Sequence, residues 1–525
     1  MQRRHLLLGS AALLSSMKVP AMPKSSAPVE LVEASATALA QAMNAGRLSA
    51  AALVQACLAR IGAIDRRGPH LNSVIELNAD ALAIARALDA ERKAGRLRGP
   101  LHGLPVLLKD NIATGDRMST SAGSIALAGQ RATRDAHLVK RLREAGAVVL
   151  GKTNLSEWAN IRSTRSTSGW SSRGGLTRNP YALDRSTSGS SSGTGAAIAA
   201  SLAPLGVGTE TDGSIVSPAS INGLVGLKPT LGRISRDGVI PIAHSQDTAG
   251  PMTRTVADAA LLYAAMLGPD AADAITAGAP AALAGDGALA PNALKGMRVG
   301  VARAYAIGFD EADAVIEQAI ARLRALGAEI IDDIGLPAVS YNDAELSVLL
   351  YELKHNLPLW FKTFMPQAKV QSLADLIAFN NAHKAQAMPW FGQELFEKAQ
   401  ALGGLDSPAY REALDACVKG SRGEGLDKVF DAHRLDAVIA PTGGPAWLID
   451  PIAGDHYGGS FSTPAAVAGY PHLTVPAGFV RGLPLGLSFV GRPFSEWRLL
   501  SMGHAFEQAT KHRRAPQYPK RSVPV

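Results

Sequence analysis

The sequence predicts an α/β protein with a largely buried sheet, and three observations support this. First, short runs with strand-like patterns alternate along the chain with amphipathic segments of helical length. Second, residues 104–108 and 147–150 form continuously apolar runs, as expected of strands covered on both faces. Third, 525 residues with 47% hydrophobic and 19% charged side chains provide enough apolar surface for a large core.

The first 150 residues contain the clearest predicted elements. Residues 34–64 have the spacing of two short helices, and Ser49 is placed to cap the second. The run 103–111 is a predicted strand that carries Lys109 near its end. The other elements predicted here are a strand at 72–78, a helix at 79–95, a helix at 135–146 that stops at a glycine, and a strand at 147–150.

The second half of the chain repeats this alternation around a long helical region. Residues 343–433 are predicted to be mostly helical, and their six clustered aromatic side chains favour core packing over a pocket mouth. Residues 269–294 are rich in Ala, Gly, Asp and Pro, which indicates a surface connection. Helices are predicted at 255–267, at 311–326 and from Ser495 onward, and strands at 297–302, 329–331, 436–440, 472–475 and 485–490.

The N-terminus has the pattern of a secretory signal. Residues 1–21 combine Arg3 and Arg4 with a short apolar run and end in small residues, which resembles a signal of the twin-arginine type. The sequence therefore predicts a signal at 1–21, a linker at 22–33, a domain at 34–525, and a periplasmic or secreted protein. The alternative is a frayed N-terminus of a cytoplasmic protein. Removal of 1–21 would lower the net charge from +8 to +5, because three basic residues and no acidic residue are lost.

Charge and cysteine content argue against several classes of partner. The net charge of +8 is modest for this length, and no lysine- or arginine-rich block is dense enough to indicate nucleic-acid binding. No segment is long and apolar enough to predict a membrane span. Cys57 and Cys417 lack metal-ligand spacing and are predicted to be buried thiols. The oligomeric state, monomer or homodimer, is left open.

The run 185–229 is the most unusual part of the chain. It begins with RSTSGSSSG, which has the composition of a flexible linker, but continues directly into the helix-prone Gly195-AAIAASLA and a short apolar run. A linker does not usually lie inside a packed core. The run is therefore predicted to shape a functional site.

Two formal motif matches carry little weight. Residues 146–153 match a phosphate-binding loop, but the residues between the glycines are Ala-Val-Val-Leu, which favour a strand. Residues 189–193 match G-x-S-x-G, with Ser191 as the nucleophile of a Ser/His/Asp hydrolase. The residues before this motif are polar and include proline, and none of the 12 histidines stands out as a base. This hydrolase stays an alternative.

Lys109 is a candidate general base. A lysine at the end of the apolar run 104–108 loses hydration, and desolvation lowers the pKa of an amine. A neutral amine can accept a proton and activate a serine. The opposing interpretation is a lysine that reaches solvent from the end of its strand.

Several collinear segments resemble the amidase signature family over nearly the whole chain. They are GLPVLLKDNI (103–112), GKTNLSEWAN (151–160), GSSSGTGAAIAA (189–200), GTETDGSIVSPASINGLVGLKPT (208–230), GPMTRTVADAA (250–260), APTGGPAW and STPAAVAGYPHLTVPAG. Within the family, the motifs TETDGSI and GSSSG are most similar to those of the peptide amidases. The resemblance implies one large amidase domain, with a mixed twisted sheet covered by helices on both sides.

The resemblance also implies a Ser–Ser–Lys triad. Lys109 matches the catalytic lysine, Ser190 the bridging serine that the family holds in a cis peptide, and Ser214 the nucleophile. The family's separation of 24 residues fits Ser190, since 214 − 190 = 24, whereas Ser191, at 23, stays the alternative. The turn Thr211–Asp212–Gly213 is expected to bind substrate and to stabilise the oxyanion. Departures from the pattern of many members are Ser188, Ser192 and Asp212, where glycine is common.

The implied activity is hydrolysis of carboxamides to acid and ammonia through an acyl-enzyme. The C-terminal amide of a peptide is the expected substrate, and region 343–433 is expected to shape the pocket. Neither a metal nor an organic cofactor is expected. The alternatives are a non-catalytic binding protein and the glutamine-hydrolysing component of an amidotransferase complex.

Overall fold

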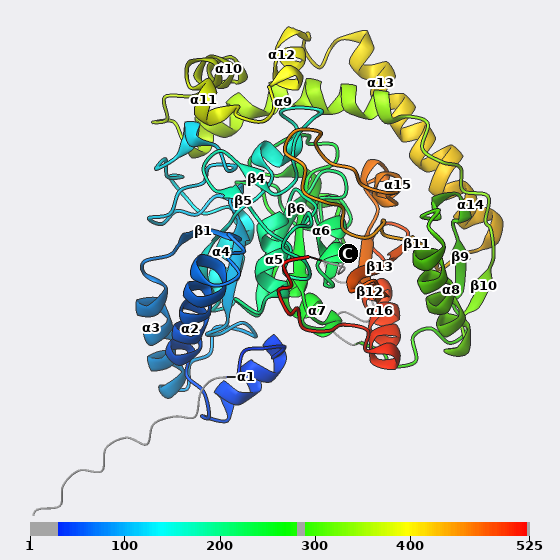
Figure 1. Cartoon of the computed structure of the whole chain (residues 1–525), viewed down its shortest axis with the longest axis horizontal. Coiled ribbons are helices and arrows are strands. Elements are labelled where there is room, and N and C mark those ends of the chain that lie inside the picture. The colour runs from blue at the N-terminus through cyan, green and yellow to red at the C-terminus, as the bar shows by residue number, and fades with distance from the viewer. Residues whose placement is uncertain (1–29, 281–288, 522–525) are drawn as a thin grey trace, which may run out of the picture.

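The computed structural model describes residues 30–280 and 289–521 and has one large mixed sheet at its centre (Figure 1). The predicted signal at 1–21 and most of the predicted linker lie outside the described residues. The eleven strands of the main sheet lie in the order β1-β3-β2-β6-β8-β7-β12-β13-β11-β9-β10, and β4 and β5 form a separate hairpin. This confirms the predicted α/β fold with a single mixed sheet.

The thirteen strands of the described residues include eight that overlap strands predicted from the sequence. Their bounds are β1 Val74–Leu77, β2 Pro105–Lys109, β3 Val148–Thr153, β4 Trp170–Ser171, β5 Gly175–Leu176, β6 Leu205–Glu210, β7 Val225–Lys228, β8 Thr248–Thr253, β9 Arg298–Val301, β10 Glu329–Ile331, β11 Ala437–Pro441, β12 His472–Val480 and β13 Leu483–Val490. Every residue of β2, β3, β6 and β13 is buried, as the continuous apolar pattern predicts.

Helices cover the sheet and its edges. Their bounds are α1 Ala36–Asn44, α2 Ala50–Arg60, α3 Ala81–Lys93, α4 His137–Glu144, α5 Ser192–Ala199, α6 Val216–Ile221, α7 Val256–Met266, α8 Asp310–Ala325, α9 Asn342–Phe364, α10 Leu373–Ala382, α11 Lys384–Ala387, α12 Glu394–Ala401, α13 Pro408–Val418, α14 Asp427–His433, α15 Ser462–Ala468 and α16 Glu496–Thr510. Ser49 caps α2 by accepting a hydrogen bond from the backbone N–H of Ala52, as predicted.

The helical region from α9 to α14 forms an arc along one side of the molecule (Figure 1). Four of its six predicted aromatic residues are buried, and Trp360 stacks on Phe364 with ring centroids 5.5 Å apart. Trp390 is exposed. These positions confirm core packing as the main role of the aromatic cluster.

The elements between 216 and 253 were not recognisable from the sequence pattern. α6 contains Pro218, and β8 contains Gly250 and Pro251, residues that disfavour a helix interior and a central strand. β8 nevertheless pairs antiparallel with both β6 and β7 in the middle of the sheet. Pairing on both sides stabilises β8 in spite of its low strand propensity.

Two smaller predictions can also be checked. Cys57 and Cys417 are buried free thiols, as predicted. Over the described ranges, the longest and most apolar helices fall short of what a bilayer crossing requires.

Candidate active site

Three side chains predicted from the sequence meet at one edge of the sheet. β2 and β6 are neighbouring parallel strands, so the end of β2, with Lys109, and the turn after β6, with Ser214, lie at the same edge. The tract before α5 brings Ser190 between them. Lys109 Nζ donates to Ser190 Oγ at 2.7 Å, and Ser190 Oγ donates to Ser214 Oγ at 3.0 Å.

Lys109 lies in an environment that favours a neutral amine. Its side chain is 0% exposed, and burial lowers its pKa from 10.5 to about 7, against the opposing charges of Glu210 and Asp247. Its other acceptors are the carbonyl and hydroxyl oxygens of Thr209, at 3.1 and 2.9 Å. Among the described residues, the hydrogen-bond acceptors of Nζ include no carboxylate. The amine is therefore held by uncharged oxygens.

The Ser/Gly tract is held tightly around Ser190. The Gly189–Ser190 peptide bond is cis, as the family resemblance implies. A Cβ at Gly189 would lie 2.2 Å from Ser156 Oγ, so only glycine fits this close approach. The backbone N–H of Ser156 donates to the carbonyl of Ser190, and Ser192 Oγ donates to the carbonyl of Ser188.

Ser191 has a different environment from Ser190. Its hydroxyl donates to the carbonyl of Thr209 at 3.1 Å and accepts from the N–H of Thr209 at 3.2 Å. It is fully buried, and no histidine is among its described hydrogen-bond partners. The structure thus ties Ser191 to β6 and places Ser190, rather than Ser191, between the lysine and Ser214.

The turn before Ser214 leaves backbone donors unused. Gly213 has φ +74°, a left-handed conformation that suits glycine, and a Cβ there would lie 2.9 Å from Ser462 Oγ. No other described residue accepts a hydrogen bond from the backbone N–H of Asp212, Gly213 or Ser214. Such free donors beside a nucleophile suit an oxyanion.

Hydrogen bonds to the carboxylates of Glu210, Asp247 and Asp212 hold this turn in place. Glu210 Oε2 accepts from the N–H groups of Ile215 and Val216 at 2.7 and 3.0 Å. Thr211 Oγ1 donates to Asp247 at 2.6 Å, and burial raises the pKa of Asp247 to about 6. Asp212 accepts from Thr463 Oγ1 at 2.6 Å. These contacts fix the backbone of Thr211, Asp212 and Gly213, the residues predicted to bind substrate, next to Ser214.

A polar cavity of about 250 Å³ opens next to these residues. Its wall combines the Ser/Gly tract, the turn before Ser214 and the segment 443–463. The lining residues are Asn160, Ser168, Ser188, Gly189, Asp212, Gly213, Ser217, Ser220, Ile221, Gly443, Gly444, Trp447, Asp455, Tyr457, Gly459, Ser460, Ser462 and Thr463. Tyr457 is 65% exposed. The lining includes two aspartates and neither lysine nor arginine.

The cavity wall differs from the one expected from the sequence. We expected region 343–433 to shape the pocket, but the described lining residues include none from that region. Its contribution lies behind the turn, where Gln246 Nε2 donates to Glu345 at 2.8 Å and to the carbonyl of Thr211 at 3.3 Å. The segment 443–463 lines the cavity instead, because the antiparallel bridge of Gly443 with Ser460 folds it back beside the site.

Two supporting residues of the site, Asn111 and Thr209, were not predicted from the sequence. Asn111 Nδ2 donates to Thr209 Oγ1 at 2.9 Å, the same hydroxyl that accepts from Lys109. The alternation of strand side chains offered a signal, since Asn111 follows Lys109 by two positions. Across the described ranges, no group of three or more His, Cys, Asp or Glu side chains is arranged to hold a metal ion.

Comparisons with known proteins agree with this arrangement. A sequence model of the family described as Amidase matches residues 52–500. The solved structure of the native peptide amidase of Stenotrophomonas maltophilia is 53% identical with a TM-score of 0.89, over 93% of this chain and 99% of that chain. A protein of Arabidopsis thaliana named probable amidase is 39% identical over 98% of this chain and 97% of its own length. One component of the glutamyl-tRNA(Gln) amidotransferase of Symbiobacterium thermophilum is 37% identical over 92% of this chain and 98% of its own length.

Proposed function

Because this chain belongs to the amidase family, we propose that it hydrolyses the C-terminal amides of peptides to acid and ammonia through an acyl-enzyme on Ser214. As a member of this family it is an amidase, a hydrolase of carbon–nitrogen bonds other than peptide bonds. The observation that carries the proposal is the continuous hydrogen-bonded path from buried Lys109 through Ser190 to Ser214.

The first step is attack of Ser214 Oγ on the amide carbonyl carbon. Its proton moves to Ser190 Oγ while the proton of Ser190 moves to the neutral amine of Lys109. A hydroxyl can donate and accept at once and can rotate between partners, which is what a relay requires. The pKa of about 7 for Lys109 leaves a substantial neutral fraction near neutral pH.

The second step is collapse of the tetrahedral intermediate. The free N–H groups of Asp212, Gly213 and Ser214 would stabilise the oxyanion while the C–N bond breaks. Lys109 returns its proton through Ser190 to the leaving nitrogen, which departs as ammonia. Water then attacks the acyl-enzyme, with the same relay removing its proton and restoring Ser214.

The composition of the cavity wall favours a substrate whose reacting end is an uncharged amide. The α-carboxylate of glutamine, at the other end of the molecule from its side-chain amide, would find no lysine or arginine among the described lining residues, which include Asp212 and Asp455. A peptide amide has no free carboxylate at its amidated end and so needs no such partner. This favours peptide amidase activity over glutamine hydrolysis within an amidotransferase, the second candidate that the family includes.

Ammonia release across a substrate panel tests the proposal. Peptide amides should be hydrolysed faster than aliphatic amides, aryl amides and glutamine, and Ser214→Ala should abolish release with an unchanged fold. Glutamine as the best substrate, or activity retained in Ser214→Ala, would contradict it.

We further propose that residues 1–21 are an export signal, as Arg3, Arg4 and the following apolar run indicate. Expression of the full chain with mass measurement of the periplasmic product tests this. A product that starts after Ala21 is expected, whereas an uncleaved cytoplasmic chain would contradict it.

A further inference from the structure

We propose that Arg173, on the β4–β5 hairpin, is a positioning residue for Lys109 that acts through Asp110. This inference rests on the proposed role of Lys109 as the base. Arg173 lies on the face of β2 opposite the three catalytic side chains, so it cannot act on the substrate itself. Its effect has to pass through the strand.

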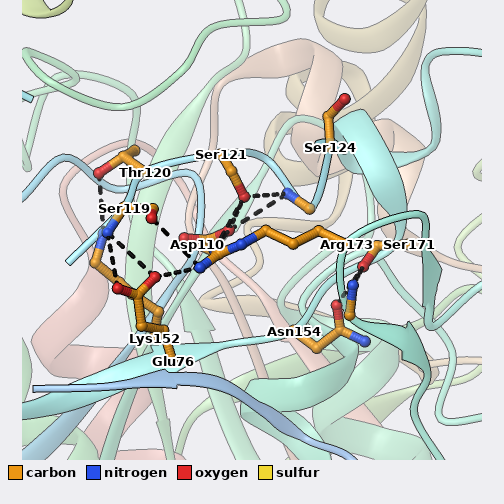
Figure 2. Close-up of polar contacts among 12 residues, drawn as sticks. Glu76, Asp110, Ser119, Thr120, Ser121, Ser124, Lys152, Asn154, Ser171 and Arg173 are labelled. Atoms are coloured by element: carbon orange, nitrogen blue, oxygen red, sulfur yellow. Dashed lines mark hydrogen bonds and ion pairs between the residues drawn. The ribbon is translucent and has the colours of Figure 1, made fainter. Parts of the chain in front are cut away.

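Arg173 connects two carboxylates that come from different strands (Figure 2). Its Nη1 donates to Asp110 Oδ2 at 3.1 Å, and its Nη2 donates to Glu76 Oε2 on β1. The same guanidinium lies 3.2 Å from Ser121 Oγ and 3.4 Å from Ser119 Oγ. The Arg173 side chain is 15% exposed, so solvent screens these contacts only weakly.

Asp110 needs this partner because it is completely buried. Its Oδ2 also accepts from Ser121 Oγ and, at 3.4 Å, from the N–H of Gly123, while its Oδ1 has no described partner. Among the described residues, Arg173 is the one cation within ion-pair distance of this carboxylate. A buried carboxylate that loses its cation becomes costly to keep in place.

The backbone links Asp110 directly to the catalytic side of the strand. Successive side chains at a strand end point to opposite faces, so Asp110 faces Arg173 while Lys109 faces Ser190. Asn111 returns to the catalytic face and donates to Thr209 Oγ1, which also accepts from Lys109. A shift of Asp110 would therefore move its two neighbours in the chain. These are Lys109 itself and Asn111, which holds the Thr209 hydroxyl that accepts from the lysine.

The hairpin is anchored well enough to serve as a fixed support. Asn154, just after β3, accepts from Ser171 Oγ at 2.6 Å (Figure 2). Its amide nitrogen donates to the carbonyl of Gly175 at 2.9 Å. Asn72, before β1, donates to the carbonyl of Leu176 at 3.2 Å. Arg173 thus extends from a hairpin fixed to strands on the far side of β2.

The test compares Arg173→Met, Arg173→Lys and Asp110→Asn in the full chain. Arg143→Met is the matched control, because Arg143 also bridges two carboxylates, Asp116 and Asp135, with a half-buried side chain. Misplacement of a catalytic group by about 1 Å can cost about 100-fold in rate. We expect Arg173→Met to lower kcat on a peptide amide by about 10- to 100-fold with KM within about twofold.

Three further readouts separate positioning from loss of stability. Arg173→Lys should recover part of the lost kcat, since a lysine can still pair with Asp110. Arg143→Met should lower the melting temperature with kcat within about twofold of the parent. The loss in Arg173→Met should be smaller on an ester of the same acyl group, because an alcohol leaves with less help from a proton than an amine does.

A folded Arg173→Met with kcat within twofold of the parent overturns the inference, as does a loss that is equal for amide and ester. If Arg173→Met does not fold, Asp110→Asn decides: kcat lowered at least fivefold supports the inference, and a smaller change overturns it. Failure of the proposed function is separate, because it would appear as activity in Lys109→Ala or Ser214→Ala.

Discussion

Lys109 and Lys152 are two buried lysines near the ends of neighbouring parallel strands, and they differ in what their amines contact. Both side chains are fully buried, and burial lowers the pKa of both. Lys152 pairs in register with Leu108 and therefore faces the opposite side of the sheet from Lys109. On that side Nζ donates to the carbonyl of Ile112 at 2.6 Å. It also donates to Thr120 Oγ1 at 3.1 Å (Figure 2).

The difference indicates what, beyond burial, the proposed role of Lys109 as a base requires. The charges of Asp110, Asp116 and Glu76 favour the protonated form of Lys152, and its contacts end on a carbonyl and a threonine. The amine of Lys109 instead contacts a serine hydroxyl that leads on to Ser214. A neutral amine with a path for its proton is what general base catalysis requires.

The largest expected effect separates the two lysines directly. Lys109→Ala should lower kcat/KM on a peptide amide by about 1,000-fold or more, because it removes the base and the source of the returning proton. Lys152→Met should keep kcat/KM within about fivefold while it changes the melting temperature. Steady-state kinetics and thermal melts measure both. Equal losses of activity in the two variants would contradict the proposal that the contacts of its amine give Lys109 a role that Lys152 lacks.

The second-largest expected effect concerns Ser190, the serine that links the amine of Lys109 to Ser214. Ser190→Ala should lower kcat by about 100- to 1,000-fold, because it breaks the link between the amine and Ser214. Ser191→Ala is the matched control and should stay within about tenfold, since Thr209 is the one partner of its hydroxyl among the described residues. The reverse order of the two losses would move the relay to Ser191.

The pH dependence follows from the lowered pKa of Lys109. Only the neutral amine accepts a proton, so kcat/KM should be level above pH 7 and fall about tenfold per pH unit below it. The unfolded chain holds this proton up to about pH 10.5, so the contribution of Lys109 to the free energy of unfolding rises with pH between 7 and 10.5. A profile that is flat from pH 5 to 8 would contradict a titrating lysine.

The smallest effect tests the second contact of the amine. Thr209→Val keeps the side-chain shape but removes the hydroxyl that accepts from Lys109 and Asn111. We expect kcat to fall about three- to tenfold, the size of one lost hydrogen bond. The kcat of this variant on a peptide amide measures it, and an increase in kcat would show that Thr209 restrains the lysine instead of placing it.

The sequence predicted the parts of the fold and site that depend on local pattern. The apolar strands β2 and β3 and the position of Lys109 followed from residue order, and the family separation pointed to Ser190. β8 was not recognisable, because Gly250 and Pro251 disfavour a strand that long-range pairing nevertheless stabilises.

The cavity wall could not be predicted for a similar reason. The segment 443–463 lies more than 200 residues from Ser214 and joins the site only through contacts such as Thr463 with Asp212. The contact of Arg173 with Asp110 could not be predicted either, because 63 residues separate the two in the sequence. Contacts of this kind leave no periodic pattern in the sequence.

The most direct test of the central claim is to map the serine that reacts. The chain would be treated with an aryl sulfonyl fluoride, with and without a peptide amide present, and the modified peptide identified by mass spectrometry. We expect one adduct on Ser214, prevented by the substrate and lost in Lys109→Ala at neutral pH. An adduct on Ser190 or Ser191, or equal labelling of Lys109→Ala, would contradict it.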